Sequence, residues 1–166
     1  MRLILSLVVL ALVSACSPTS DYDDQVYDDF DPSMSRSWDS NKHEECVPFA
    51  RRRSGIQIRG NAHTWWNKCD PNQRSVRPKE GAVMVLSKTR RLRYGHLAVV
   101  KDLVSRREIN VTHTNWGSNR KKRLVVYESM RVKDVSPNND WSSAVFWNKY
   151  TNAYGSPYKV SGFILP

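Results

Sequence analysis

The chain has 166 residues, of which 40% are hydrophobic and 25% are charged, and its formal charge at pH 7 is +10. This composition is typical of a globular protein and excludes collagen-like, coiled-coil and wholly disordered chains. The length fits one domain with a sizeable core, and no apolar run approaches the ~18 residues of a membrane-spanning helix, which excludes a multi-pass membrane protein.

The chain begins with a short basic start and an apolar run over residues 3–13. This run is too short to span a bilayer and is typical of a signal peptide. It ends in Val13-Ser14-Ala15-Cys16, which resembles the bacterial lipobox. The resemblance implies a signal peptide over residues 1–15, lipid attachment at Cys16, and an outer-membrane lipoprotein of the cell envelope that faces the periplasm. An ordinary secretory signal with a coincidental cysteine is the alternative.

Residues 16–41 follow as a polar segment of Ser, Asp, Pro and scattered Tyr without a sustained apolar period. Low hydrophobicity and dense like charge predict a disordered acidic tether here. Residues 1–45 hold nine of the 16 acids and three of the 26 bases, so residues 46–166 carry a net charge of +16. This asymmetry indicates a polyanionic partner, such as nucleic acid, anionic lipid headgroups or acidic cell-wall polymers.

The remaining domain, residues 42–166, is expected to begin with two short helices. Residues 46–54 have Pro48 near their start, arginines in the last turn and Gly55 just beyond. Asn61 is placed to cap a second helix that ends at residue 68. Short apolar runs of β character then predict strands over residues 82–86, 97–100, 109–112, 124–127 and 160–165. The predicted fold class is α+β, with the N-terminal helices packed on an antiparallel β-sheet.

Three residue types in this domain suggest a thiol hydrolase. Cys46 stands in the first turn of a predicted helix, where the partial positive charge is expected to lower the pKa of its thiol. His96 follows Gly95 at the start of a predicted strand, from which it can act as a general base. Alternation along the next strand places His113 and Asn115 on one face. A polar residue there could accept the N–H of His96 and fix its tautomer.

Five blocks of sequence, in order, resemble a CHAP domain, the family of cysteine, histidine-dependent amidohydrolases and peptidases among the papain-like cell-wall hydrolases. The blocks are Glu45-Cys46-Val47-Pro48-Phe49-Ala50, Gly60-Asn61-Ala62, Pro78-Lys79-Glu80-Gly81-Ala82-Val83, Gly95-His96-Leu97-Ala98-Val99-Val100 and Thr112-His113-Thr114-Asn115-Trp116. The resemblance covers residues 42–166. It implies a papain-like cysteine hydrolase core that cleaves an amide bond of peptidoglycan, as an N-acetylmuramoyl-L-alanine amidase or as a peptide endopeptidase.

The resemblance also implies roles for single residues. Cys46 is the nucleophile, and its backbone N–H is the expected first oxyanion donor; His96 is the general base. Many CHAP domains have Glu two residues before the Asn, where this chain has His113, so either His113 or Asn115 orients His96. His113 is the preferred candidate because a ring nitrogen can accept the bond directly. Trp116 is a candidate wall of the substrate cleft. No metal or cofactor is expected, and no His–Cys cluster has zinc-ligand spacing.

Two alternatives stay open at this point. A structural disulfide between Cys46 and Cys69 would persist in an oxidising compartment and would abolish catalysis. A non-catalytic, basic module that binds the cell envelope could have the same fold. A nucleic-acid binder is disfavoured because no RNA-binding motif is recognisable. The expected partners are therefore peptidoglycan, the membrane through the lipid anchor and anionic envelope polymers, and the expected state is a monomer.

Overall fold

The structure is a computed structural model that describes residues 44–166. The predicted signal peptide (1–15) and the predicted tether (16–41), including Cys16, lie outside the described residues. Within the described part of the chain, no helix has the length and apolar character needed to cross a membrane.

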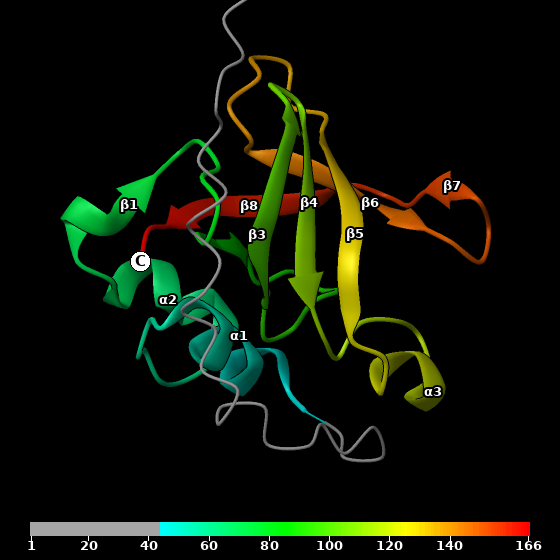
Figure 1. Ribbon diagram of the computed structural model, residues 1–166, viewed down its shortest axis with the longest axis horizontal. Helices are drawn as coiled ribbons and strands as arrows, with labels where there is room; N and C mark the ends of the chain where they lie inside the picture. Colours follow the sequence, from blue (N-terminus) through cyan, green and yellow to red (C-terminus); the bar gives the residue numbers. More distant parts are fainter. Residues whose placement is uncertain (1–43) are drawn as a thin grey trace, which may run out of the picture. The chain divides into compact units, whose positions relative to one another are not determined.

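Two short helical segments precede the strands of the described chain (Figure 1). Helix α1 (Cys46–Ser54) has the predicted bounds and ends at Gly55, whose φ of 76° is left-handed and therefore suits glycine. The second segment begins as a 3-10 turn, η2 (Ala62–Thr64), and continues as α2 (Trp65–Lys68). Both predicted helices are therefore present. Asn61 occupies the predicted N-cap position, but its side chain makes no capping hydrogen bond.

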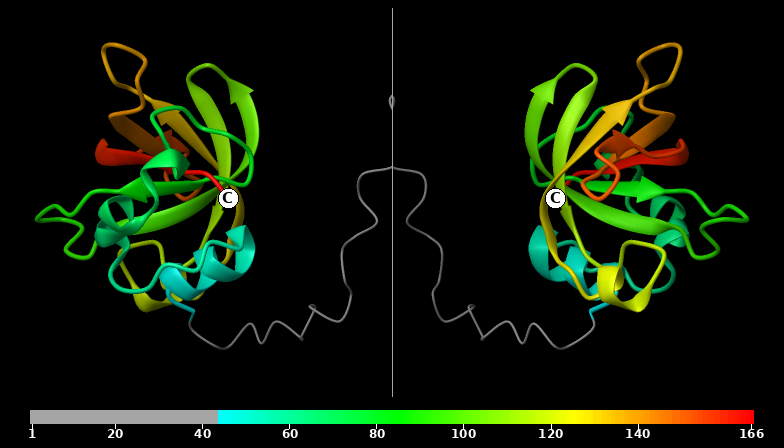
Figure 2. Two further views of the ribbon diagram at one scale, coloured as in Figure 1. Left: turned by 90° about the vertical axis from the view of Figure 1, so that its left-hand side faces the viewer. Right: turned by 90° about the vertical axis from the view of Figure 1, so that its right-hand side faces the viewer.

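The strands of residues 44–166 form one antiparallel sheet in the order β1-β8-β2-β3-β4-β5-β6-β7. Strand β8 also pairs with β6, so β2 to β6 and β8 close into a barrel-like sheet (Figures 1 and 2). The bounds are β1 (Arg74–Ser75), β2 (Val83–Leu86), β3 (His96–Ser105), β4 (Glu108–His113), β5 (Tyr127–Asp134), β6 (Ser143–Asn148), β7 (Ala153–Tyr154) and β8 (Tyr158–Ile164).

The predicted antiparallel sheet is confirmed, and it is more extensive than predicted. Four predicted strands correspond to β2, β3, β4 and β8. The strand predicted over 124–127 is wrong, because a helical turn, α3 (Arg120–Arg123), occupies the preceding residues and β5 begins only at residue 127. This turn forms because the Asn119 side chain accepts a hydrogen bond from the backbone N–H of Lys122 at 3.0 Å.

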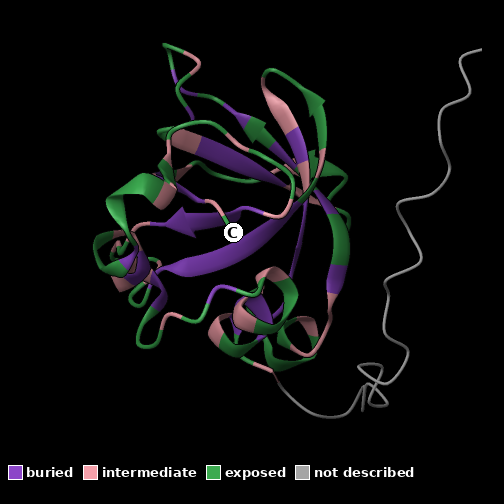
Figure 3. Ribbon diagram, turned by 60° about the vertical axis from the view of Figure 1, so that its left-hand side comes forward, coloured by how far each residue is buried: buried purple, intermediate pink, exposed green. Residues whose placement is uncertain are grey.

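Strand β2 and the first half of β3 are buried on both faces, whereas the second half of β3 is mostly exposed. Figure 3 colours the chain by burial. One face joins the large core of the closed sheet through Met84, Leu86, Ala98 and Val100. The other face belongs to a second cluster, shared with residues of α1, η2 and α2; its members include Cys46, Ala50, Ala62, Trp65, Val83, Val85, Leu97 and Val99. Since strand residues alternate, His96 lies on the face of Ala98, toward the large core.

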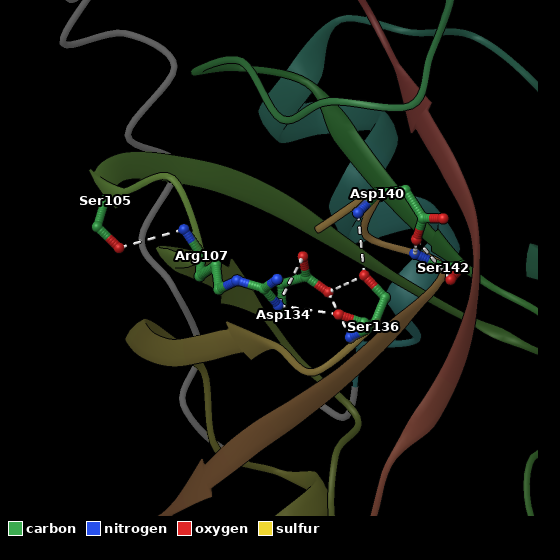
Figure 4. Close-up of polar contacts among 6 residues, drawn as sticks. All are labelled: Ser105, Arg107, Asp134, Ser136, Asp140 and Ser142. Atoms are coloured by element: carbon green, nitrogen blue, oxygen red, sulfur yellow. Dashed lines mark hydrogen bonds and ion pairs between the residues drawn. The ribbon is translucent and has the colours of Figure 1, made fainter. Parts of the chain in front are cut away.

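The connection from β5 to β6 is built on a buried carboxylate (Figure 4). Asp134 ends β5, and its Oδ1 accepts hydrogen bonds from the backbone N–H and the hydroxyl of Ser136 at 2.7 and 2.6 Å. Arg107, from the β3–β4 turn, lies 3.8 Å from the other carboxylate oxygen. A second turn of the same form follows, in which Asp140 accepts from the N–H and hydroxyl of Ser142. These bonds fix the path of the chain into β6.

Candidate active site

Two of the predicted catalytic residues are the first residues of their elements. Cys46 begins α1, and His96 begins β3. Gly95, before the histidine, has a φ of 70°, and a Cβ there would lie 2.6 Å from the Leu86 carbonyl oxygen and 2.7 Å from the His63 nitrogen. Only glycine fits this close approach of three chain segments. A glycine is therefore needed at position 95 for the chain to place His96 at the start of β3.

Cys46 and His96 line one pocket of ≈ 990 Å³. Asn115 and Trp116 also line this pocket, so the structure brings four of the five predicted site residues to its walls. The fifth, His113, is fully buried. It lies behind His96, because the Nε2 of His96 is 2.8 Å from the Nδ1 of His113.

The structure distinguishes between the two candidates for the residue next to His96. His113 forms a buried hydrogen bond with the His96 ring. Asn115 does not continue the strand as predicted: β4 ends at His113, and Asn115 has a left-handed φ of 55°. Its side-chain nitrogen donates to the carboxylate of Glu45. The expected shared face of His113 and Asn115 is therefore wrong, because the chain turns after residue 113.

Cys46 is only 8% exposed, and burial raises the pKa of its thiol to about 11. The nearby charge of Glu45 adds to this rise in the pKa. Backbone N–H groups oppose it: that of Leu97 most strongly, and those of Cys46 and Val47 more weakly. The expectation of a lowered thiol pKa is wrong, because the loss of hydration outweighs the donors at the helix start. The resting thiol is protonated at neutral pH.

Both histidines are neutral at pH 7. Burial lowers the pKa of His96 from its ordinary value of 6.5 to about 3. Burial, and then the proximity of His96, lowers the pKa of His113 well below its usual range. The neutral thiol and the neutral imidazole line the same pocket, so the resting site holds no thiolate–imidazolium pair.

An aromatic wall stands beside the histidines. The Trp116 ring centroid lies 4.6 Å from that of His96 and 5.3 Å from that of His113. Phe146 and Tyr158 pack on Trp116 at 4.9 and 5.0 Å. Sequence reasoning found Trp116 but missed the other two rings, because β6 was not predicted and the start of β8 was placed two residues too late.

Cys46 and Cys69 are both free and buried. The thiol of Cys69 donates to the backbone oxygen of Trp66 at 3.3 Å. The alternative of a disulfide between the two cysteines is therefore wrong for this fold.

The family model of the CHAP domain matches residues 36–115. This segment includes Cys46, His96, His113 and Asn115. The chain is also similar to a crystal structure of N-acetylmuramoyl-L-alanine amidase from Staphylococcus aureus, with 22% identity and a TM-score of 0.46; the similarity covers 87% of this chain and 38% of that one. The chain thus spans well under half of that protein's length. No curated protein has a significantly similar sequence.

The pocket extends beyond the segment that matches the CHAP family, and cations line it both within and beyond that segment. We call five pocket-lining cations the cationic rim: Arg91, Arg93, Lys122, Arg123 and Lys149. One acid, Glu45, lines the same pocket. Among residues 44–166, no cation of the rim forms an ion pair with a carboxylate. The pocket therefore favours an anionic ligand.

Aromatic rings hold several cations of the rim in place. The Arg91 guanidinium lies 3.9 Å from the centre of the Tyr158 ring. Lys122 and Lys149 share the Tyr150 ring, at 4.6 and 5.4 Å. Cation–π contacts of this kind orient a charge without neutralising it. The rim comes from chain segments far apart in sequence, so the sequence indicated a strongly basic domain without predicting that these charges meet at one pocket.

Proposed function

We propose that this chain is a CHAP-type peptidoglycan hydrolase that cleaves an amide bond through Cys46. One observation carries the proposal: Cys46 and His96 line the same pocket, and a second buried histidine is hydrogen-bonded to the far nitrogen of His96. The family match over residues 36–115 supports it, since that segment includes all three residues. A papain-like arrangement of the core belongs to the same proposal.

The chemistry starts from a neutral pair. Since the Nε2 of His96 is engaged by His113, the Nδ1 of His96 accepts the thiol proton while the sulfur of Cys46 attacks the carbonyl carbon. The backbone N–H of Cys46 is the first donor to the oxyanion. As the C–N bond breaks, His96 returns the proton to the leaving amine and a thioester forms. Water then attacks the thioester, His96 takes its proton, and the thiol of Cys46 is regenerated as the acid leaves.

The cationic rim supports a substrate with negative charges near the scissile amide. The stem peptides of peptidoglycan carry free carboxylates, whereas its unmodified glycan backbone has no comparable charge density. Unpaired cations at a pocket raise the local concentration of such a ligand and orient it. Both an N-acetylmuramoyl-L-alanine amidase and a peptide endopeptidase would hold the stem peptide in this pocket.

The proposed location is the cell envelope. The sequence of residues 1–15 supports export, and the lipobox-like end supports lipid attachment at Cys16. More than one acyl chain would hold the protein stably on a bilayer. As an outer-membrane lipoprotein facing the periplasm, the enzyme would be tethered beside its polymer substrate.

Digestion of purified peptidoglycan tests the proposal. The full chain in detergent, under reducing conditions, is compared with Cys46→Ala and with Cys69→Ala, the matched change at the other buried free cysteine. We expect soluble fragments from the wild type and from Cys69→Ala, and none from Cys46→Ala. Fragment masses identify the bond: a free L-alanine amino group marks an amidase, and a new amino group within the peptide marks an endopeptidase.

The second candidate function is a non-catalytic envelope-binding module, which the cationic rim favours. No fragment release by any of the three chains, together with equal binding of all three to peptidoglycan, would replace the enzyme proposal with this one.

A further inference from the structure

The far side of the His113 ring faces a methionine. The Nε2 of His113 lies 3.3 Å from the sulfur of Met130 on β5, and both residues are buried. The sheet register explains the contact. Met130 pairs with Val111 across β4 and β5, and His113 lies two residues further along β4 on the same face. The two side chains are therefore diagonal neighbours on the core face of the sheet.

The chemistry of sulfur assigns a direction to this contact. A thioether has lone pairs and no proton, so the Met130 sulfur can only accept a hydrogen bond. The hydrogen must therefore be on the Nε2 of His113. A neutral imidazole carries one N–H, so the Nδ1 of His113 is bare and accepts from the Nε2–H of His96 across 2.8 Å. His96, neutral in turn, has a bare Nδ1.

The reversed arrangement keeps the bond between the histidines but disables the base. If His113 carried its hydrogen on Nδ1, it would donate to the Nε2 of His96, and His96 would then carry a hydrogen on Nδ1. That nitrogen could no longer accept the thiol proton of Cys46. Each arrangement has one bond between the two histidine rings, so within residues 44–166 the contact with the Met130 sulfur is the feature that distinguishes them.

The other neighbours of the His113 ring are aromatic. The rings of Trp116, Tyr127 and Phe146 surround it at centroid distances of 5.3, 5.3 and 5.8 Å. The hydroxyl of Tyr127 donates to the backbone oxygens of Trp116 and Lys122. Within residues 44–166, the Met130 sulfur is thus the acceptor that faces the Nε2 of His113.

We propose that Met130 is a positioning residue, whose sulfur accepts the Nε2–H of His113 and thereby fixes the tautomers of His113 and His96. The tautomer that results leaves the Nδ1 lone pair of His96 available to Cys46. The catalytic consequence rests on the proposed function, whereas the assignment of the tautomers does not.

Nitrogen NMR of the full chain, labelled with ¹⁵N-histidine, tests the assignment. In the wild type we expect His96 and His113 both to be protonated at Nε2 and bare at Nδ1. Met130→Leu keeps the side-chain volume and removes the acceptor, and it should shift both rings toward the Nδ1–H form. Met84→Leu is the matched control, because Met84 is buried in the same core cluster; it should leave both rings as in the wild type.

Two NMR outcomes would overturn the proposal: a wild-type His113 protonated at Nδ1, or tautomers unchanged by Met130→Leu. The wild-type spectrum is sufficient for the first of these, so the proposal stays testable even if Met130→Leu does not fold.

Kinetics then test the catalytic consequence on soluble peptidoglycan fragments. Met130→Leu should lower kcat by about twofold with little change in KM, since one weak neutral hydrogen bond favours the competent arrangement by about 5:1 and its loss leaves the two arrangements about equally populated. Met84→Leu should keep both constants. A fall in kcat without a change of tautomer would indicate damage to the core and would overturn the positioning role. If the wild type hydrolyses nothing, the proposed function fails, and the NMR result still decides the assignment.

Discussion

The rings of His96 and His113 are joined edge to edge in the interior, with the Nε2 of the first 2.8 Å from the Nδ1 of the second. Their planes meet at 75°, so the bond is made at the ring edges without stacking. Burial lowers the pKa of both rings. A neutral imidazole orients its neighbour but stabilises an imidazolium less than a carboxylate does. Under the proposed mechanism, the proton would therefore pass to His96 within the attack step, and no thiolate would be stored in the resting protein.

The first prediction concerns the reactivity of Cys46. Because burial raises its thiol pKa to about 11, the thiolate fraction grows throughout the range from pH 7 to 10. Alkylation by iodoacetamide should therefore accelerate by roughly tenfold per pH unit, without levelling off near the ordinary thiol pKa of about 8.5. Mass spectrometry of the Cys46 peptide measures the rate, in a Cys69→Ala background. A rate that is already constant below pH 8 would mean that a thiolate–imidazolium pair exists in the resting protein.

The second prediction is a loss of stability in mild acid. The folded His96 has a pKa of about 3 against an ordinary value of 6.5, so below pH 6.5 the unfolded chain binds a proton that the folded chain does not. Stability is then present above pH 6.5 and is lost as the pH falls toward 3, by up to about 1.4 kcal/mol per pH unit for each buried ring. Urea unfolding from pH 7.5 to 5 measures the slope.

Histidine variants separate this effect from general acid sensitivity. His96→Gln should reduce the dependence of the unfolding free energy on pH. His63→Gln, which changes a half-buried histidine whose Nδ1 bonds the Tyr94 carbonyl oxygen, is the control for the substitution itself. An unchanged slope in His96→Gln would contradict the prediction.

The third prediction concerns the cationic rim. Arg91→Ala should raise KM for stem-peptide fragments by about two- to fivefold, the range expected for one exposed charge contact. Added salt should weaken wild-type binding by screening the rim. Arg74→Ala is the matched control, because Arg74 also lies over an aromatic ring, that of Trp66 at 5.5 Å, but does not line the pocket. Equal effects of the two substitutions would exclude a specific role for the rim.

The helices and four of the strands were predictable because their signals are local. Pro48, the terminal arginines and Gly55 mark both ends of α1, and apolar runs mark β2, β3, β4 and β8. Two local signals also predicted the site: the Gly-His pair at the start of β3 and the cysteine at the start of α1. Cys46 and His96 line the same pocket.

The remaining features depend on contacts that local sequence does not encode. Strand β5 ends in Asp134, which looks like a solvent-exposed polar residue in sequence but is buried by Ser136 and Arg107. The closure of the sheet depends on the pairing of β6 with β8, which is visible only in three dimensions. The raised thiol pKa depends on how deeply Cys46 is buried. The contact of Met130 with His113 could not be predicted from the sequence, because a single methionine on a core face of a strand is common.

The fourth prediction compares two turns of identical local form. Asp134 and Asp140 each accept hydrogen bonds from the N–H and the hydroxyl of the serine two residues later, but the Asp134 side chain is fully buried whereas Asp140 is exposed. Asp134→Ala should lower the free energy of unfolding by about 2–3 kcal/mol, because it leaves buried donors without an acceptor. In Asp140→Ala, water can replace the lost acceptor, so the loss should be clearly smaller. Urea unfolding of both variants measures the difference, and equal losses would show that the turn itself, rather than its burial, determines the stability of this connection.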